Sequence, residues 1–289
     1  MSGTVAALAL SSAFLSAAAT ILIRQGLRGS GPYTGVWINM LVGTVCLWAG
    51  VLVTGGVGRP TPTAVALFVL AGLIGTVAGR VLRFFAIDAV GASITGAFMN
   101  VTPLVSSGLA ILLLGERVTI PVVVGTLVIV AGATLLSAGG RSLGVRPAQL
   151  LLPILSATCF GIVAILRKIA LSGMAPVPGT AVNVTTALVV FTGFLVASGQ
   201  SRAMVCRGPS LIYFLAAGVA ENMGVFLVVL ALSVGTVSVV APLTNVTPLF
   251  VILFSLLFLR GIEALNARVI GGSALIVVGA CLITALGGR

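Results

Sequence analysis

The string Asn-Val-Thr-Pro occurs twice in this chain, at residues 100–103 and again at residues 245–248. Each copy lies inside a long apolar stretch: GAFMNVTPLVSSGLAILLLG at 96–115 and APLTNVTPLFVILFSLLFL at 241–259. Asparagine is a weak helix former, and proline removes a backbone hydrogen bond, so neither suits the interior of an apolar helix. The same unfavourable string in two such places predicts that the chain is an internal repeat.

The composition predicts that lipid is the main solvent of this protein. Of its 289 residues, 59% are hydrophobic and 7% charged, and the mean hydropathy is +1.30. Soluble domains carry about 25% charged residues. A bilayer core needs roughly 20 apolar residues per helix. We therefore predict an all-α polytopic membrane protein with ten spans, at about 3–23, 34–54, 63–88, 91–114, 118–138, 149–168, 177–198, 209–233, 236–259 and 265–286.

Several classes of function are disfavoured by the residues present. The net charge of +11 comes from basic residues dispersed at span ends, which is typical of membrane proteins and not of a nucleic-acid-binding stripe. Four scattered cysteines form neither a metal motif nor a disulfide framework. With no histidine, no clustered acid pair and no phosphate-binding loop, we expect no enzyme, no ATP hydrolysis and no cofactor. No basic residue precedes the first apolar run, so we expect that run to be retained as a span.

The repeat extends well beyond the two Asn-Val-Thr-Pro strings. It predicts two five-helix halves, 1–140 and 147–289. Because five is odd, consecutive halves must cross the membrane in opposite directions, which is the inverted topology of many transporters. A shift of about 145 residues aligns Asn39 with Asn183, Arg24 with Arg167, Gly125 with Gly272, Gly132 with Gly279, and Glu116 with Glu263.

The prolines of the repeated string, Pro103 and Pro248, are predicted to break the fourth and ninth spans. In lipid, a carbonyl that loses its helical partner needs another one. The side chains of Asn100 and Asn245 are candidates for that role. We expect both halves to bring these residues to a shared cavity near the membrane centre; the alternative is that each proline only bends its helix for packing.

This pattern resembles the drug/metabolite transporter superfamily of the EamA type, with proline midway in the fourth and ninth spans and an acidic residue shortly after. The matching stretches are residues 75–119 and 222–263. The resemblance implies secondary transport by alternating access in a prokaryotic plasma membrane, with cytoplasmic termini. Charge counting alone favours the opposite orientation. Two departures from the family pattern are the arginines of span three and the sequence Arg-Gly-Ile-Glu where a Gly-Glu pair is usual.

The two arginines of span three, Arg80 and Arg83, lie three apart on one helical face, with Phe84 beside them. An arginine at the bilayer centre costs roughly 2.5–3.5 kcal/mol, so each should face a cavity or a partner; the alternative is that they extend to the headgroups. Span eight, the repeat partner of span three, holds Glu221 and Asn222. We predict that Glu221 neutralises Arg80, or both arginines in part, and that it could take up a coupling proton.

The predicted function is transport of a small metabolite that bears a carboxylate or phosphate, the groups that arginine binds through paired hydrogen bonds. Alternatives are a flippase for lipid-linked intermediates, a drug or cation exporter, or a non-transporting membrane scaffold. Expected partners are the substrate, membrane lipids, and a coupling proton or counter-substrate. The candidate substrate-binding residues are Arg80, Arg83, Phe84, Asn100, Glu221, Asn222 and Asn245.

Overall fold

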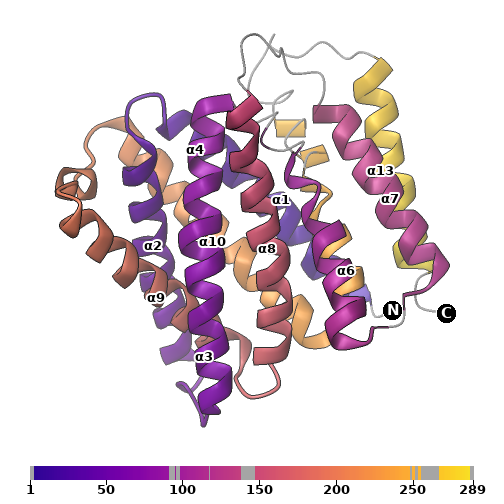
Figure 1. Ribbon diagram of the computed structural model, residues 1–289, viewed down its shortest axis with the longest axis horizontal. Coiled ribbons are helices and arrows are strands. Elements are labelled where there is room, and N and C mark those ends of the chain that lie inside the picture. Colours follow the sequence, from indigo (N-terminus) through magenta and orange to yellow (C-terminus); the bar gives the residue numbers. More distant parts are fainter. Residues whose placement is uncertain are drawn as a thin grey trace.

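The computed structural model describes residues 3–90, 95, 98–116, 118–137, 147–247, 249–250, 253–254 and 267–286. Every regular element in these residues is helical, as predicted, and the helices form one bundle (Figure 1). The elements are α1 (Gly3–Gly26), α2 (Pro32–Val53), α3 (Pro62–Ala71), the π-helical η1 (Gly72–Gly79), α4 (Arg80–Val90), α6 (Thr102–Leu114), α7 (Ile120–Ser137), η2 (Pro147–Leu150), α8 (Leu151–Ala170), α9 (Pro176–Ala197), η3 (Ser201–Met204), α10 (Pro209–Val234), α11 (Val237–Thr244) and α13 (Ala267–Leu286).

Six helical segments among the described residues are long and apolar enough to cross a membrane. They are α1, α2, the continuous α3–η1–α4, α8 with the end of η2, α9 and α10. Three shorter apolar helices, at 102–114, 120–135 and 274–283, lie within other predicted spans. Large apolar side chains cover the outside of the bundle; Leu52 and Leu112, for example, are each 79% exposed. Such a surface fits a lipid environment.

Proline marks the start of four of these helices. Pro32, Pro62, Pro176 and Pro209 each lie in the first turn of their helix. Proline is favoured there because the first N–H groups of a helix have no intrahelical partner and the ring presets the helical φ angle. Each of these four helices therefore starts at a proline that follows directly after the connection from the preceding helix.

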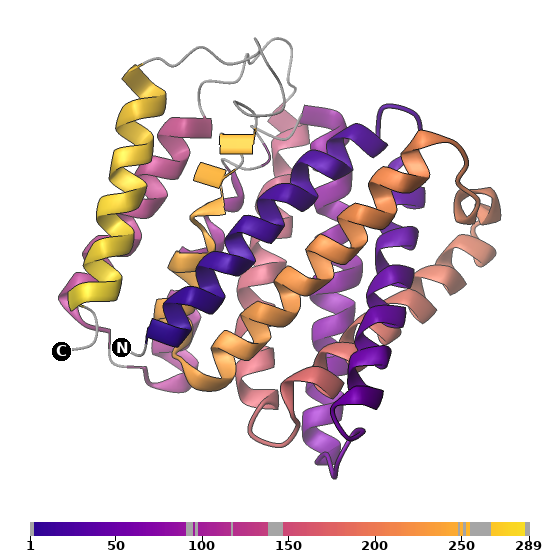
Figure 2. The same cartoon turned by 180° about the vertical axis from the view of Figure 1, so that it is seen from behind.

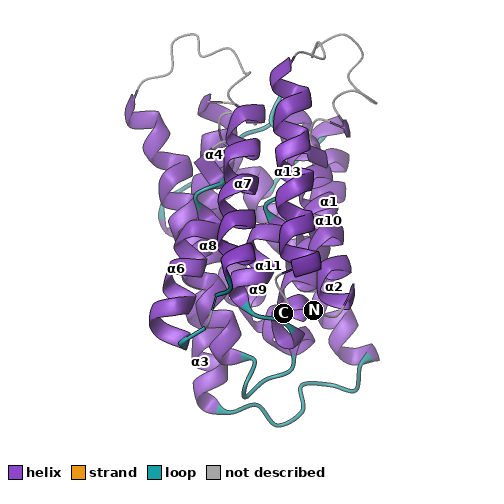
Figure 3. Ribbon diagram, turned by 90° about the vertical axis from the view of Figure 1, so that its right-hand side faces the viewer, coloured by secondary structure: helices purple, strands orange, loops and turns teal. Residues whose placement is uncertain are grey.

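The two halves run in opposite directions through the bundle. In Figures 1 and 2, α1, α3 and α9 begin at the end of the bundle where α2, α8 and α10 finish. The loop residues Thr61 and Gly173 are hydrogen-bonded at that end. The start of α1 and the end of α13 lie there too (Figure 3). Each of the first three spans is therefore antiparallel to its repeat mate, which fits an inverted repeat.

Hydrogen bonds between the halves repeat with the same register. The Ser12 hydroxyl of α1 donates to the Gly224 carbonyl of α10, at 2.9 Å. The Ser156 hydroxyl of α8 donates to the Gly79 carbonyl of η1, at 2.7 Å. Since α8 is the mate of α1, and α10 the mate of the helix containing η1, these two bonds are copies of one contact. They pair Ser12 with Ser156 and Gly79 with Gly224.

A second pair of bonds corrects the predicted alignment of Arg24 with Arg167. Arg24 donates to the carbonyl of Ile87, and Lys168 donates to the carbonyl of Leu232. The register of the serine bonds makes these two contacts copies as well. Lys168 is therefore the structural counterpart of Arg24, and Arg167 corresponds to an apolar residue. The sequence alignment failed because it matched identical letters across a one-residue shift.

Glycines allow close contact between α7 and α13. A Cβ at Gly125 would lie 2.8 Å from the Gly279 carbonyl oxygen, and a Cβ at Gly132 would lie 2.7 Å from that of Gly272. The repeat exchanges Gly125 with Gly272 and Gly132 with Gly279, so the two contacts are related as a twofold axis requires. These glycines thus form a small-residue contact between equivalent helices of the two halves.

We expect Gly132→Ala to destabilise the protein by about 1–3 kcal/mol, the usual cost of overfilling a packed contact. The new methyl group would meet backbone atoms, which cannot move without separating α7 from α13. Gly108→Ala is the matched control, because no atom lies within 4 Å of its Cβ position in α6. Thermal unfolding in detergent measures both variants, and equal melting temperatures would contradict the close approach.

The C-terminal end of α6 carries a carboxylate to the start of α11. Gly115 adopts the left-handed φ of +63° that lets the chain turn there. The next residue, Glu116, accepts bonds from the backbone N–H groups of Val237 (2.9 Å) and Ser238 (3.0 Å). A carboxylate at a helix N-terminus satisfies free donors and complements the helix dipole. Its predicted repeat mate, Glu263, lies outside the described residues.

Candidate functional site

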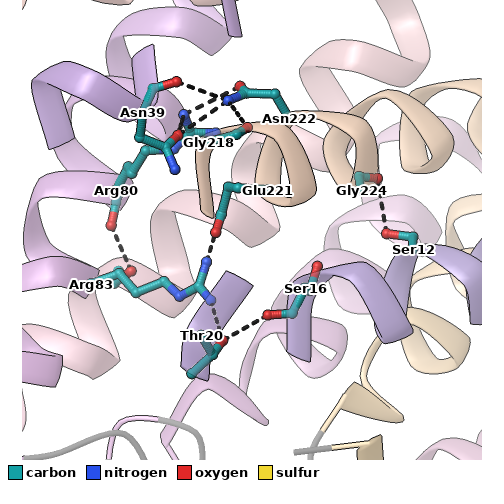
Figure 4. A network of polar contacts seen from close by, with 12 residues as sticks. Ser12, Ser16, Thr20, Asn39, Arg80, Arg83, Gly218, Glu221, Asn222 and Gly224 are labelled. Carbon is teal, nitrogen blue, oxygen red and sulfur yellow. Dashed lines mark hydrogen bonds and ion pairs between the residues drawn. The ribbon is translucent and has the colours of Figure 1, made fainter. Parts of the chain in front are cut away.

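An ion pair connects the two halves inside the bundle (Figure 4). Arg83 of α4 donates through Nη1 to Oε1 of Glu221 of α10, at 2.5 Å. Its Nη2 donates to the Thr20 hydroxyl of α1, at 2.7 Å. The side chains of Arg83 and Glu221 are 12% and 5% exposed, and theirs is the one ion pair found among the described residues. The contact joins two helices of the first half to one of the second.

Of the two arginines that were predicted to pair with Glu221, Arg83 makes the ion pair, and the prediction that Arg80 is its main partner is wrong. Arg80 donates to Oδ1 of Asn39, at 2.6 Å, and at 3.4 Å to Oδ1 of Asn222. Helical side chains tilt toward the N-terminus of their helix. The Arg80 side chain therefore extends back along η1 and reaches Asn39 of α2. Arg83 lies one turn further along α4, where its side chain reaches Glu221.

Asn222 connects the Arg80 environment to the second half. Its Nδ2 donates to the backbone carbonyl of Asn39 (2.9 Å), to Oδ1 of Asn39 (3.2 Å) and to the carbonyl of Gly218 (2.8 Å). Figure 4 shows these groups together above the Arg83–Glu221 pair. The predicted residues Arg80, Arg83, Glu221 and Asn222 are thus gathered in two adjoining polar contacts.

Polar atoms without partners remain in this cluster. Arg80 is 1% exposed, so it does not extend to the headgroups. Its Nε, the Nδ2 of Asn39 and the Oε2 of Glu221 are buried and make no hydrogen bond. Each unmade bond of a buried polar group costs about 1–3 kcal/mol, more for a charged one. The site therefore keeps hydrogen-bonding capacity that a bound molecule could use.

The π-helical segment η1 sets the position of Arg80. The backbone N–H of Arg80 donates to the carbonyl of Gly75, five residues earlier. Glycines let the neighbouring helices approach η1: a Cβ at Gly72 would lie 2.5 Å from the Asn183 carbonyl oxygen of α9. The repeat mate α10 is α-helical throughout. This difference in winding was not predicted from the sequence.

Phe84 lies among apolar side chains. It is fully buried in a cluster with Ile23, Val36, Met40 and Ile87. Its neighbours are contributed by α1, α2 and α4. The predicted role of Phe84 in substrate binding stays a prediction.

The two Asn-Val-Thr-Pro strings meet each other. Nδ2 of Asn245 donates to Oδ1 of Asn100, at 3.0 Å. Equivalent residues of two copies touch directly only near the axis that relates the copies. Each asparagine opens a two-residue turn between helical segments, and Pro103 lies in the first turn of α6. Pro248 lies outside the described residues.

Sequence reasoning missed a buried cation, Arg167. It is 7% exposed, and its Nε and Nη2 both donate to Oδ1 of Asn183, at 3.2 and 2.9 Å. Nδ2 of Asn183 in turn donates to the Thr76 hydroxyl in η1, at 2.7 Å. The offset that aligns Asn39 with Asn183 would have placed Lys168 opposite Arg24 and left Arg167 unmatched in a span. An arginine inside a span with no charged counterpart in the other half was therefore the signal that could have identified Arg167.

A metal-ligand cluster and a surface pocket are the two other kinds of site to consider in the described residues. Nowhere in the ranges that the structure describes do three or more His, Cys, Asp or Glu side chains gather as metal ligands would. A surface depression of about 500 Å³ lies between the loops 57–61 and 171–176. Neither Arg80, Arg83 nor Arg167 lines this depression. We therefore take the polar contacts around Arg80 and Arg83 as the candidate site.

The family profile of the EamA-like transporters matches the chain twice, at residues 3–138 and 148–285. The chain belongs to the EamA-like transporter family. The EamA-like protein is therefore a membrane transporter of small molecules, built from two repeats. A solved structure described as "Crystal structure of protein" shares its fold, with a TM-score of 0.78, 19% identity and 98% of each chain covered. A comparison with curated proteins gave no match.

Proposed function

We propose that this protein is a secondary-active transporter that moves a small metabolite bearing a carboxylate or phosphate by alternating access. The observation that carries the proposal is Arg80. It is buried among helices of both halves, has no carboxylate partner in the described residues, and keeps an unpartnered Nε. A buried, planar guanidinium with a free donor favours a carboxylate or a phosphate, which it binds through paired hydrogen bonds.

The Arg83–Glu221 pair is a contact that can form and break during the transport cycle. Inverted-repeat transporters alternate by moving one half or bundle against another around a fixed site. Because Arg83 belongs to the first half and Glu221 to the second, such a movement makes or breaks their contact. The proposal thus assigns substrate contact to Arg80 and Asn222, and closure between the halves to Arg83 and Glu221.

Secondary-active transport needs a source of energy, which is either a coupling proton or a counter-substrate. Glu221 is the buried acid of the described residues, and its Oε2 has no hydrogen bond, so a coupling proton would bind there. A counter-substrate needs no such acid. Uptake measured with and without a pH gradient separates the two.

The function is tested with purified protein in lipid vesicles. We expect accumulation of at least one radiolabelled metabolite with a carboxylate or phosphate, from a panel of anions, zwitterions and cations. Empty vesicles and vesicles with heat-denatured protein are the controls. Transport of cations alone would favour the exporter alternative, and movement of lipid-linked molecules alone would favour the flippase. If the protein moves none of the panel, the proposal is wrong.

We also propose ten membrane-crossing spans with cytoplasmic termini, in a prokaryotic plasma membrane, on the strength of the family resemblance. Arg28, Arg202 and Arg207 lie at the bundle end opposite the termini, which the positive-inside rule would make cytoplasmic instead. Cysteine introduced at Gly58 or Gln200, in a chain without its native cysteines, decides the matter. We expect an impermeant maleimide to label intact cells at position 200 only; labelling at position 58 only would reverse the orientation.

A further inference from the structure

The repeat separates structural polar residues from those that one half has acquired alone. The register of the serine bonds places Val225 opposite Arg80 and Ile23 opposite Arg167. Polar residues that serve the frame, such as the two serines, occur in both halves. Arg80 and Arg167 each occur in one half only, yet each is buried. Packing of the duplicated frame therefore does not require these arginines.

The two arginines approach each other from antiparallel helices. Arg80 begins α4, and Arg167 lies near the end of α8, which packs along η1 and α4. Since side chains tilt toward the N-terminus of their own helix, the two guanidinium groups lean toward a common level. Asn183, which holds Arg167, bonds to Thr76, one helical turn before Arg80.

Each guanidinium is held by a repeat-equivalent amide, which carries no charge. Oδ1 of Asn39 accepts from Arg80, and Oδ1 of Asn183 accepts from Arg167. These bonds fix the direction of each arginine, but a neutral amide supplies no negative charge to it. The unpartnered Nε of Arg80 and Nδ2 of Asn39 are both donors. These two free donors could hydrogen-bond an anion beside Arg80.

None of the carboxylates in the described residues pairs with Arg80 or Arg167. Among the described acids, Glu221 pairs with Arg83, Glu116 holds the start of α11, and Asp88 is exposed. Within those same residues no carboxylate lies within ion-pair distance of Arg80 or Arg167. Two buried like charges are costly unless a bound anion neutralises them.

We infer that the transporter binds a dianion, with Arg80 of the first half and Arg167 of the second half each contacting one end or one face of it. This inference rests on the proposed function and names its substrate class. A phosphate monoester and a dicarboxylate share the required chemistry of two negative charges. Arg83, neutralised by Glu221, is left out of the binding pair. A monoanion would leave one buried positive charge unbalanced.

The test measures binding by purified protein in nanodiscs of uncharged lipid. The probes are inorganic phosphate at pH 8 and succinate, with acetate and chloride at matched ionic strength. We expect at least one dianion to raise the melting temperature in a saturable manner, and the monoanions to have little effect. In Arg80→Gln and in Arg167→Gln the apparent Kd for that dianion should rise about tenfold or more.

Arg24→Gln is the matched control, since Arg24 is an exposed arginine that donates to a backbone carbonyl. Its Kd should stay within about twofold of the unmodified protein, because its charge lies outside the pair. If a glutamine variant does not fold, Arg80→Lys and Arg167→Lys replace it; these keep the charge but lose the paired donors, so the Kd should still rise. A response to phosphate alone indicates a phosphate ester, and a response to succinate alone a dicarboxylate.

Several results would overturn the inference. They are no response to either dianion, an equal response to acetate, or unchanged dianion affinity in the Arg167 variants. The vesicle assay keeps the proposed function separate. If a dianion binds through both arginines but nothing crosses the vesicle membrane, the transporter proposal fails and the dianion site stands. If the vesicles accumulate a cation or a neutral molecule only, the dianion site fails and transport stands.

Discussion

Glu221→Gln alone should destabilise the protein by about 3–5 kcal/mol, whereas replacing Glu221 and Arg83 together should cost much less. Removing one partner of a buried ion pair leaves the other charge uncompensated in a low-dielectric interior, while removing both can be nearly neutral. Glu221 is the counter-charge to Arg83 in the described residues, so its loss leaves that arginine with only the Thr20 hydroxyl.

A double-mutant cycle measures this difference. The variants are Glu221→Gln, Arg83→Met and their combination, with unfolding free energies obtained by denaturant titration in mixed micelles. A parallel cycle of Glu221→Gln with Arg24→Gln should be additive, because Arg24 makes its contact elsewhere. A larger coupling of Glu221 to Arg80 than to Arg83 would show that the pairing predicted from sequence is the correct one.

Arg80→Lys and Arg80→Gln are expected to weaken the transport affinity for an anionic substrate by on the order of a hundredfold, while both proteins still fold and insert. Truncating one partner of a buried charged contact costs about 2–5 kcal/mol, and each 1.4 kcal/mol is a factor of ten. Lysine is expected to fail as well, because it cannot offer the paired donors of a guanidinium.

The measurement is the KM for uptake into vesicles, with the amount of inserted protein determined for each variant. Arg24→Lys and Arg24→Gln serve as matched controls and should leave KM unchanged. A purely structural role for Arg80, holding Asn39 and Asn222, predicts instead that the variants lose stability while the remaining folded protein keeps its KM. An unchanged KM in both Arg80 variants would remove this residue from the substrate site.

Helix positions and the repeat were predictable because both depend on features that the sequence displays directly. A long apolar run must become a helix in lipid, since its backbone groups have no other partners. The boundaries of α1, α2, α9 and α10 differ from the predicted spans by only a few residues. The repeated Asn-Val-Thr-Pro string likewise identified two residues that touch each other, Asn100 and Asn245.

The partners of the charged residues were not predictable to the same degree. Residues three apart share a helical face, but which of them meets an acid on another helix depends on tilt, axial level and winding. Arg80 and Arg83 differ by one turn, and that difference decides the partner of Glu221. Arg167 was missed for a simpler reason: near a helix end, beside Lys168, it looked like an ordinary edge residue.

The π-helical winding of η1 determines the direction in which Arg80 and Arg83 point. In a π-helix each N–H bonds five residues back, so each turn holds more residues than an α-turn. Converting one such turn to α-helical winding would rotate all later residues by about 100° and displace them about 1.5 Å, the increments of one residue. Arg80 and Arg83 directly follow η1 and would turn together, one leaving Asn39 and the other Glu221. A screw motion within a single helix would thus release the contact between Arg80 and Asn39 and the contact between the halves in one step.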